Sequence, residues 1–385
     1  MSDRKAPLDG IVTVDLTRVL AGPYLTMMLA EMGARVIKVE VPGTGDDARH
    51  FGPFVEGQSA YFAGINRGKQ SIALNLKEKE DRDLFLRLVR KADVLVENFK
   101  PGTMEKLDLG WESLHEMNSR LIYAAVSGFG HTGPYRDRPA YDLVVQAMGG
   151  IMSLTGHAGE SPVRVGTSLG DITAALFGLS GVLAALYDRE VTGRGTKVDV
   201  AMLDCQVAIL ENAIGRYFAD GRIPGPLGMR HPSITPFSGL RTRTGEYLVL
   251  AVGNDAMFRR LCTLIDREDL SADERYATNG GRTDHHESLY AELEQALSGK
   301  TMEQWLELFN SNGIPCGPIN NVRDVVEDPQ VLSRNMIVTA KGERGLVFRM
   351  PGNPVKFSNY GDPDTRGAIP ACDADRAAIL EFLEE

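Results

Sequence analysis

The sequence is poor in cysteine and lacks the cysteine patterns that hold metals or form redox pairs. Its 385 residues include only Cys205, Cys262, Cys316 and Cys372. They are far apart and form no CxxC pair, which excludes a zinc ribbon and a dithiol redox motif. We therefore expect four buried or free thiols in a reducing compartment.

Long apolar runs and an excess of basic residues are also missing. The longest apolar stretch, 176–187, is interrupted by Gly and Ser and is far shorter than the roughly 20 residues that span a bilayer. The first ten residues lack the apolar core of a signal peptide. The chain has 42 Lys and Arg against 52 Asp and Glu, a net charge of −10, and no basic face offsets it. We expect a cytoplasmic protein that binds neither membranes nor nucleic acid.

Signatures of metal and serine chemistry are absent as well. His285 and His286 are adjacent and would point to different helix faces, and no HExxH motif occurs. A GxSxG nucleophile elbow is missing too. The sequence therefore predicts neither a metal site nor a serine hydrolase.

What the chain does contain is an alternation of strand-like and helix-like segments. Strands are expected at 11–15, 35–41, 71–75, 93–96 and 121–126, and helices at 24–32, 78–91 and 111–118. This alternation predicts an α/β fold with a Rossmann-like, doubly wound parallel sheet in a large domain. The helix expected at 171–189 is apolar almost all round, so we expect it to be buried on most faces.

A Gly- and Pro-rich stretch, 223–232, marks the start of a second, smaller α+β domain. A hairpin is expected over 236–252 with its turn at Thr244-Gly245. Helices are expected at 257–265, 287–297 and 302–310, followed by a break at 313–318 and a short helix at 373–383.

One glycine-rich segment invites comparison with a dinucleotide-binding loop. Gly43–Ala48 reads GxGxxA, but it follows the second strand instead of the first. Asp46 and Asp47 would also put negative charge where a pyrophosphate must approach. We interpret the segment as an acidic loop.

Asp171 is the strongest candidate for chemistry, because it lies at the start of the long apolar helix. A helix N-terminus favours the ionised carboxylate, the form that acts as a nucleophile. The alternative is structural: Ser168 as the N-cap with Asp171 three residues on would form a variant of the capping box. The residues alone leave both interpretations open.

Further candidates, three lysines among them, lie at or just after strand ends, where α/β sheets bind ligands. Each could also be an ordinary packing or surface residue. They are Lys77, Asn98, Phe99, Lys100 and Lys106, together with the pair Tyr141 and Asp142 in a helical turn that ends at a Gly pair.

Six separated motifs together resemble the class III CoA-transferases, the formyl-CoA transferase or CaiB/BaiF type. Their order and spacing hold across nearly the whole chain. The motifs are Arg18–Pro23, Val36–Glu40 with Gly43–Asp46, Asp93–Phe99 with Pro101-Gly102, Ser127–Tyr135, Tyr141-Asp142 and Val165–Asp171.

The resemblance implies an enzyme in which Asp171 is the nucleophile. Its carboxylate attacks an acyl-CoA thioester to give a mixed anhydride, and the released CoA then forms an aspartyl-CoA thioester. A carboxylic acid acceptor repeats the cycle in reverse. The family implies no tightly bound cofactor, with the coenzyme A thioester as substrate.

The resemblance also implies which residues bind the substrates. The CoA-binding set corresponds to Leu20, Ala21, Leu74, Lys77, Asn98, Phe99, Lys106, Ala140, Tyr141 and Asp142. Arg230 or His231 could meet the distal carboxylate of a diacid. Gly253, with Asn254, corresponds to a mobile glycine loop, although the glycine run itself is missing.

Two departures bear on the substrate. Leu20 and Val41 stand where the formyl-CoA and oxalate enzymes have glutamine and arginine, so formyl-CoA with oxalate is not the expected pair. The segments Thr155–Glu160 and Gly228–Pro232 resemble those of members that handle succinate, glutarate or mesaconate. We therefore expect a dicarboxylyl-CoA donor such as succinyl-CoA.

The resemblance finally implies an interlocked homodimer. Residues 1–224 would form the first part of the large CoA-binding domain and 225–325 the small domain. Residues 326–385 would return to the large domain.

Two other functions remain open. The α-methylacyl-CoA racemases share the fold but have a histidine where this chain has Tyr141. A non-catalytic acyl-CoA-binding protein would use Asp171 only as a helix cap.

Overall fold

The computed structural model describes residues 5–385 and divides them into two compact units. Unit 1 contains the chain up to Met152, then Arg164–Arg222 and Pro329–Glu385. Unit 2 contains Ser153–Val163 and Ile223–Asp328. The sequence placed the small domain at 225–325, within a few residues of the second segment, but it left 153–163 in the large domain.

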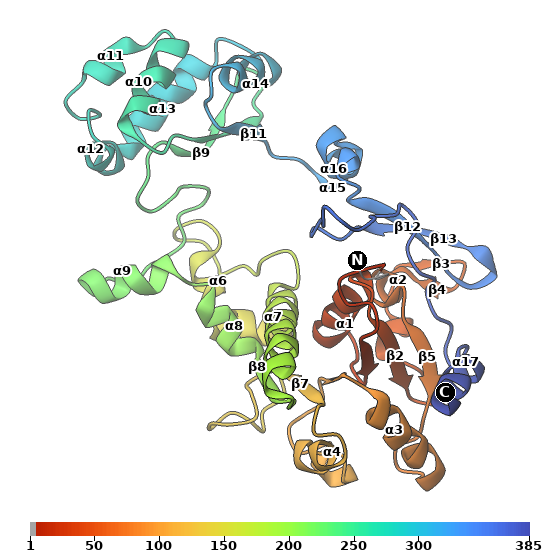
Figure 1. The fold of residues 1–385 in the computed structure, drawn as a ribbon. Helices are drawn as coiled ribbons and strands as arrows, with labels where there is room; N and C mark the ends of the chain where they lie inside the picture. The colour runs from red at the N-terminus through yellow and green to blue at the C-terminus, as the bar shows by residue number, and fades with distance from the viewer. Residues whose placement is uncertain (1–4) are drawn as a thin grey trace. The chain divides into compact units, whose positions relative to one another are not determined.

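Unit 1 is built on a six-stranded parallel sheet of order β5-β2-β1-β6-β7-β8 (Figure 1). Counting only these strands along the chain, the order is 3-2-1-4-5-6, that of the doubly wound Rossmann fold. The edge strand β8 is more exposed than the others and was not predicted. The strands are β1 Val12–Asp15, β2 Arg35–Glu40, β5 Gln70–Ala73, β6 Val94–Glu97, β7 Ile122–Ser127 and β8 Lys197–Ala201.

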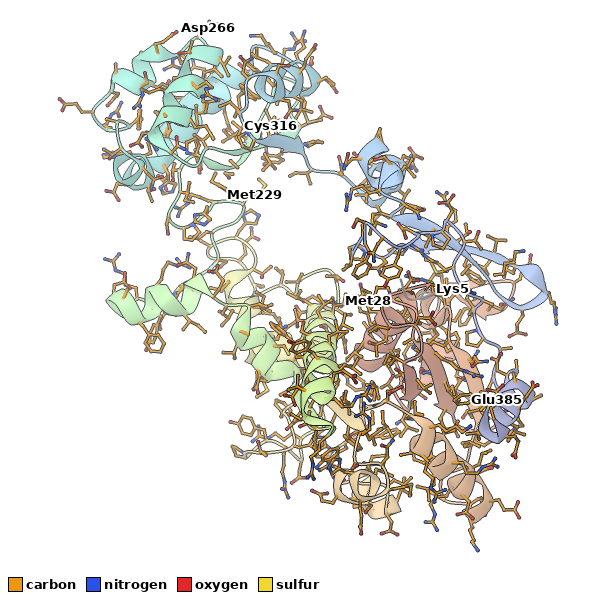
Figure 2. All side chains as sticks on the ribbon, in the orientation of Figure 1. Lys5, Met28, Met229, Asp266, Cys316 and Glu385 are labelled. Atoms are coloured by element: carbon orange, nitrogen blue, oxygen red, sulfur yellow. The ribbon has the colours of Figure 1, made fainter. Side chains whose placement is uncertain are left out.

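Helices cover both faces of this sheet, which explains why its inner strands are almost continuously apolar. On one face, α1 (Ala21–Glu31) and α7 (Leu169–Thr192) pack on β2, β6 and β7, and Met28 of α1 lies within that core (Figure 2). On the other face lies a core from α3 (Lys79–Lys91), α4 (Trp111–Met117) and α17 (Arg376–Glu384).

Helix α7 is not buried on most faces, so that prediction is wrong for the single chain. Leu176, Phe177, Tyr187 and Val191 are exposed, and Tyr187 keeps 77% of its surface. Among the described residues, α7 is the one helix long and apolar enough to cross a membrane, and half of its most apolar window is buried within the protein. One apolar face of α7 is therefore uncovered in the chain alone.

The last part of the C-terminal segment of unit 1, with α17, packs against β5, the free edge of the sheet (Figure 1). Backbone N–H groups of Ser71 and Ala73 in β5 donate to the carboxylates of Asp375 and Asp373, each at 2.8 Å. These bonds satisfy donors that an edge strand would otherwise expose. The segment holds α16 Pro329–Ser333, the hairpin β12 Ile337–Lys341 and β13 Val347–Pro351, and η3 Glu343–Gly345.

The other elements of unit 1 connect this framework. They are η1 Asp47–His50, the hairpin β3 Phe54–Val55 and β4 Gln58–Ser59, α2 Ala60–Asn66, η2 Glu105–Leu107, α5 Asp142–Met148, α8 Met202–Ala208 and α9 Asn212–Asp220. Helix α6, Ile151–Leu154, crosses from unit 1 into unit 2.

Unit 2 has a three-stranded antiparallel sheet of order β11-β10-β9. The predicted hairpin is confirmed as β9 Phe237–Arg241 and β10 Tyr247–Ala251. The segment predicted as a break contributes β11 Cys316–Pro318, on which Cys316 lies (Figure 2). The helices are α10 Asp255–Leu264, α11 Glu268–Ala272, α12 Asn279–Asp284, α13 His286–Leu297, α14 Met302–Ser311 and α15 Val322–Glu327.

Candidate active site

The site of unit 1 lies where the strand order reverses, between β1 and β6. These strands pair in parallel, so the loops after Asp15 and Glu97 leave from the same edge of the sheet. Doubly wound sheets bind ligands at this edge, because the connections on the two sides of the reversal leave a crevice there. The predicted Leu20 ends the first of these loops, Ala21 begins α1, and the predicted residues 98–99 are in the second loop.

The two loops are tied together by Asn98. Its side-chain oxygen accepts from the Arg18 backbone N–H at 2.9 Å, and its NH₂ donates to the Arg18 carbonyl at 2.8 Å. Asn98 was predicted to bind CoA, and the structure shows that its amide also fixes the backbone beside the cleft.

A buried ion-pair network supports the loop after β1. Asp15 accepts from Lys69 at 2.9 Å, and Lys38 pairs with Asp46 at 2.8 Å. Burial alone would raise the pKa of Asp15, but the ammonium groups of Lys69 and Lys38 outweigh it and hold the pKa below the usual value. The segment interpreted as an acidic loop places Asp46 in the interior, 1% exposed.

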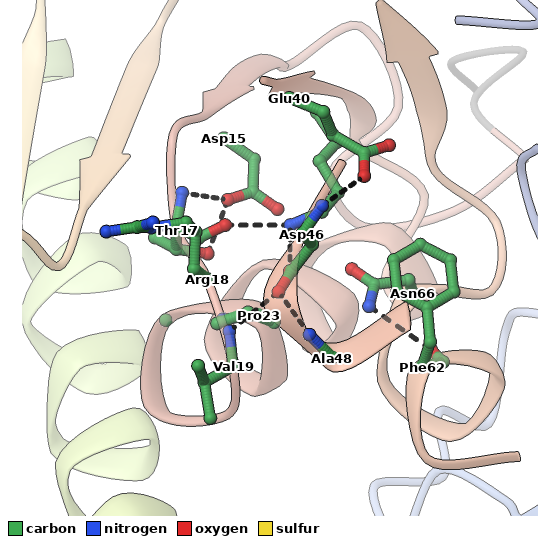
Figure 3. Close-up of polar contacts among 12 residues, drawn as sticks. Asp15, Thr17, Arg18, Val19, Pro23, Glu40, Asp46, Ala48, Phe62 and Asn66 are labelled. Carbon is green, nitrogen blue, oxygen red and sulfur yellow. Dashed lines mark hydrogen bonds and ion pairs between the residues drawn. The ribbon is translucent and has the colours of Figure 1, made fainter. Parts of the chain in front are cut away.

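Asp46 also stabilises an unusual backbone conformation at the cleft. Val19 has a φ of 68°, in the left-handed region that β-branched residues avoid. Asp46 Oδ1 accepts from the N–H groups of Val19 and Ala48, at 3.0 and 2.9 Å (Figure 3). The network therefore holds the loop in a shape that the local sequence disfavours.

A cleft of about 280 Å³ opens at this point, and Asp171 is in its wall. Its lining combines the two strand-end loops with the segment before α5. Of the residues predicted from the sequence, the cleft brings together Leu20, Ala21, Asn98, Phe99, Lys100, Ala140, Tyr141 and Asp171.

Asp171 itself lies in the first turn of α7, partly buried. No donor among residues 5–385 is hydrogen-bonded to its carboxylate, and Ser168, at the N-cap position, makes no side-chain cap bond. The capping-box alternative is therefore not formed. Burial, assisted by the charge of Asp142, raises the pKa of Asp171 to about 7. With this raised pKa, part of the group is protonated near neutral pH, although a helix N-terminus by itself favours the ionised form.

Tyr61 is a neighbour that the sequence analysis missed. Burial raises its pKa to about 12, and the charges of Asp171, Asp46 and Asp142 add to the effect. Its ring packs edge-on against Phe51, with centroids 5.8 Å apart. Tyr61 comes from α2, and no motif in the sequence links it to position 171.

Asp142 does not line the cleft, although it was predicted to bind CoA. Its carboxylate is buried, accepts from the Gly170 backbone N–H at 2.8 Å and accepts from Gln146 at 2.9 and 3.0 Å. Asp142 therefore faces Gly170, the residue that precedes Asp171 at the start of α7.

The remaining CoA candidates lie in two pockets that adjoin the cleft. Leu74 and Lys77 line a pocket of about 500 Å³ that shares Arg18 and Phe99 with it. Lys106 lines another, of about 410 Å³, which shares Pro101 and Arg136. The cations that the sequence analysis missed along this surface are Arg18, Arg136, Arg138 and Lys197. Arg18 could have been found, because it follows the first strand directly.

The four substrate candidates outside unit 1 belong to unit 2. The His231 ring lies 5.3 Å from that of Phe237, and its Nδ1 accepts from Ser233. The Asn254 side chain accepts from the Met257 N–H at 2.9 Å and caps α10. The charge of Arg230 acts on Tyr290 and partly offsets the rise that burial causes in the pKa of Tyr290, and Gly253 has no side chain.

No group of three His, Cys, Asp or Glu side chains in residues 5–385 is arranged to hold a metal ion. The chemical resource of the cleft is instead one carboxylate with a pKa raised to about 7 and no hydrogen-bond partner in the described chain, in a cleft whose lining also includes arginine and lysine side chains. A carboxylate of this kind can attack an acyl carbon.

Comparison with known proteins agrees with this geometry. A family model described as CoA-transferase family III matches residues 8–376. The chain is 46% identical to an acetyl-CoA:oxalate CoA-transferase of Acetobacter aceti, over 97% of this chain and 95% of that protein. It is 43% identical to a succinate–glutarate CoA-transferase of Agrobacterium fabrum, over 93% and 91%.

A solved structure of a CAIB/BAIF family protein from Brucella suis is also similar. It matches with a TM-score of 0.85 at 40% identity, over 99% of this chain and 100% of that one. Sequence and fold therefore lead to the same conclusion: the chain belongs to CoA-transferase family III and is a class III CoA-transferase.

Proposed function

We propose that this enzyme transfers coenzyme A from a dicarboxylyl-CoA to a free dicarboxylic acid, with Asp171 as the covalent nucleophile. The observation that carries the proposal is the Asp171 carboxylate in the wall of the cleft, with a raised pKa and no hydrogen-bond donor among residues 5–385. A carboxylate that no donor among residues 5–385 holds is available to a substrate carbonyl.

The reaction balances without an external energy source. An Asp171 oxygen attacks the thioester carbon, the C–S bond breaks, and CoA leaves as a thiolate. The thiolate attacks the Asp171 carbonyl of the resulting anhydride and expels the donor acid, which carries away one Asp171 oxygen. The acceptor carboxylate attacks the aspartyl thioester, which releases the CoA thiolate and gives a second anhydride. The thiolate then attacks the acceptor's acyl carbon in this anhydride and frees the Asp171 carboxylate.

Each complete cycle therefore leaves one acceptor oxygen on Asp171. The burial that raises the Asp171 pKa also protects the anhydride and thioester from water. The same burial keeps Asp171 protonated in part of the enzyme molecules below neutral pH, and a protonated Asp171 cannot attack.

We propose that the adjoining pockets hold the nucleotide end of CoA. Lys77 and Lys106 line the two different pockets that adjoin the cleft, and Arg18 borders two of the three hollows. Lysine ammonium groups suit phosphates as point charges, and arginine adds a planar fork.

The acid substrate is proposed from the relatives. Their names include oxalate, glutarate and succinate, and a Haloarcula marismortui relative at 40% identity is a succinyl-CoA:mesaconate CoA-transferase. We propose diacids of this class, with C4 to C6 acids preferred. In this proposal Arg230 or His231 donates hydrogen bonds to the distal carboxylate of the diacid. Oxalate belongs in any test, because a 46% identical relative carries it in its name.

We also propose that the enzyme works as a homodimer, interlocked as in its family. The uncovered apolar side chains of α7 and those of Tyr217 and Phe218 in α9 favour burial against a second copy. Unfolding should then depend on protein concentration. Sedimentation that shows a monomer at all concentrations would contradict this.

The decisive experiment follows the oxygen. Enzyme, succinyl-CoA and an ¹⁸O-labelled acceptor acid are incubated, and the peptide containing residue 171 is analysed by mass spectrometry. We expect label on Asp171 in the wild type and none in Asp171→Asn. A matrix of acyl-CoA donors and diacid acceptors, read as CoA products, then defines the specificity. Turnover that leaves Asp171 unlabelled would refute the mechanism, and exclusive use of formate and oxalate would refute the substrate class.

A further inference from the structure

The orientation of the Asp171 carboxylate depends on the backbone around it. No donor in the described chain holds the carboxylate, so its direction is set by the first turn of α7 and by the side-chain rotamer. The Ser168 side chain does not cap that turn. Whatever fixes the start of α7 therefore also fixes the reacting oxygen atoms.

A buried side chain of α5 supplies the missing fixation. Gln146 is fully buried, and its Oε1 accepts from the Val165 backbone N–H at 2.9 Å. Its Nε2 lies 3.3 Å from the Thr167 carbonyl, to which it donates. One amide thus holds two points of the loop that leads into α7.

The same amide also orients Asp142. Gln146 Nε2 lies 3.0 and 2.9 Å from the two Asp142 oxygens, and Asp142 Oδ1 accepts from the Gly170 N–H at 2.8 Å. The carboxylate of Asp142 therefore takes the place of the absent N-cap. Loop, cap and helix start form one continuous set of hydrogen bonds, which we name the Gln146 clasp (Gln146, Asp142, Val165, Thr167 and Gly170).

Close packing leaves this arrangement little freedom. A Cβ built on Gly170 would lie 2.5 Å from Val145 Cγ2 and 3.1 Å from Asp142 Oδ1. Only glycine lets α5 approach so closely. A shift of the clasp would therefore be transmitted to α7.

Electrostatics gives the clasp a second effect. Asp142 is the charge that adds to burial in raising the pKa of Asp171, and the same charge acts on Tyr61. Arg164, about half exposed, approaches Asp142 Oδ2 at 3.6 Å from the outer side. The hydrogen bonds from Gln146 Nε2 hold the Asp142 carboxylate in position relative to Asp171, Tyr61 and Arg164.

We propose that Gln146 is a positioning residue for the transfer reaction: through the clasp it fixes the geometry of the nucleophile without touching substrate. This rests on the proposed role of Asp171 and goes further by naming a residue outside the cleft on which turnover depends. Because the nucleophile must lie within a few tenths of an ångström of its attack geometry, loss of the clasp lowers kcat more than it raises KM.

The test replaces Gln146 by methionine, which is similar in length and has no amide. We expect kcat to fall about 100-fold, the scale of a 1 Å misplacement, while KM for the acyl-CoA stays within about threefold. The matched control is Gln206→Met on α8. Gln206 is equally buried and donates to Thr173 of α7 at 3.0 Å, but among the described residues it makes no hydrogen bond to Asp142 or to the loop before α7. It should lose stability and keep kcat within about threefold.

A double-mutant cycle tests the role of Gln146 even if the methionine variant does not fold. In Gln146→Glu the new carboxylate faces the carboxylate of Asp142, so the pair has no donor. In Asp142→Asn the new amide NH₂ faces the NH₂ of Gln146, so two donors oppose each other. The double variant exchanges donor and acceptor and restores the pair, so we expect it to recover kcat above either single variant. It should also shift the pH profile of kcat, since the charge has moved from position 142.

Three results would overturn the proposal: an unchanged kcat in Gln146→Met, an equal loss in Gln206→Met, or a double variant no better than the product of the single ones. The wild-type enzyme is tested for ¹⁸O label on Asp171 in the same experiment. This measurement separates the claim about the nucleophile from the claim about Gln146. If the wild type carries no label, the nucleophile proposal fails. If it is labelled and the variants behave as in these three results, only the role of Gln146 fails.

Discussion

Asp15 and Asp171 are two largely buried aspartates of the same unit, and their surroundings give them opposite properties. Asp15 is fully buried, bonds Lys69, Thr17 and Thr26, and has a lowered pKa. Asp171 has no hydrogen-bond donor among residues 5–385, and its pKa is raised to about 7.

The difference shows how one side-chain type serves structure or chemistry. A carboxylate surrounded by donors and a cation is stable as an anion and unreactive, whereas one that is desolvated without compensation is a stronger base and nucleophile. The first holds the loop after β1 in shape. The second, we propose, uses that shaped cleft. Four experiments test this contrast.

The largest expected effect is on activity. Asp171→Asn should lower kcat at least about 10⁴-fold, the scale of losing a covalent nucleophile. The isosteric amide keeps the shape of the side chain and removes only its nucleophilic oxygen. The measurement is CoA exchange followed by mass spectrometry. If the variant retains a tenth of the wild-type rate, Asp171 is not the nucleophile.

Removing the partner of Asp15 should mainly affect stability. Lys69→Met leaves a carboxylate buried without its ion pair, at a cost of about 3–5 kcal/mol in the free energy of unfolding. Urea denaturation measures this. Lys79→Met, on the exposed face of α3, is the matched control and should change the value by less than about 0.5 kcal/mol. Similar effects in the two variants would mean that the buried pair has no special role.

Replacing Asp171 should have the opposite effect on stability. Its folded pKa of about 7 lies above the ordinary 3.8, so ionisation in the folded state destabilises the enzyme as pH rises from about 4 to 7. Asp171→Asn removes this penalty and should stabilise the protein by up to about 4 kcal/mol above pH 7, with no gain near pH 4. Urea unfolding at both pH values checks this. Asp188→Asn, exposed on α7, should show no such pH dependence.

The smallest expected effect concerns the pH dependence of catalysis. Below about pH 7, kcat/KM should rise about tenfold per pH unit and then level off, since only ionised Asp171 attacks. Asp142→Asn removes the negative charge that adds to burial, so the curve should move to lower pH. A profile that stays in place would show that burial alone sets the pKa.

Much of the fold could be read from the sequence because its signals are local. The segment 11–15 is β-branched and became β1, and the predicted turn at Thr244-Gly245 joins β9 to β10. Strand β8 was missed because it is half exposed at the sheet edge and only pairing with β7 defines it. The hairpin β12–β13 was missed because its strands are also only half buried and are defined by pairing with each other.

The site was predicted less completely. Motifs placed Leu20, Asn98, Ala140 and Asp171 in one cleft although they are far apart in sequence. They could not reveal Tyr61 or Gln146, whose importance lies only in which side chains they approach. Asp142 was recognised, but its orientation toward Gly170 instead of the cleft depends on the packing of α5 against α7.

By itself the sequence determined the α/β class, the series of strand-end motifs and the family that those motifs resemble. All of these depend on residue types at fixed spacings. The tertiary structure alone decided which buried carboxylate acquires a cation and which does not. Burial, charge separation and hydrogen bonding act between atoms that are neighbours in space and distant along the chain, so no local pattern encodes the pKa of Asp171.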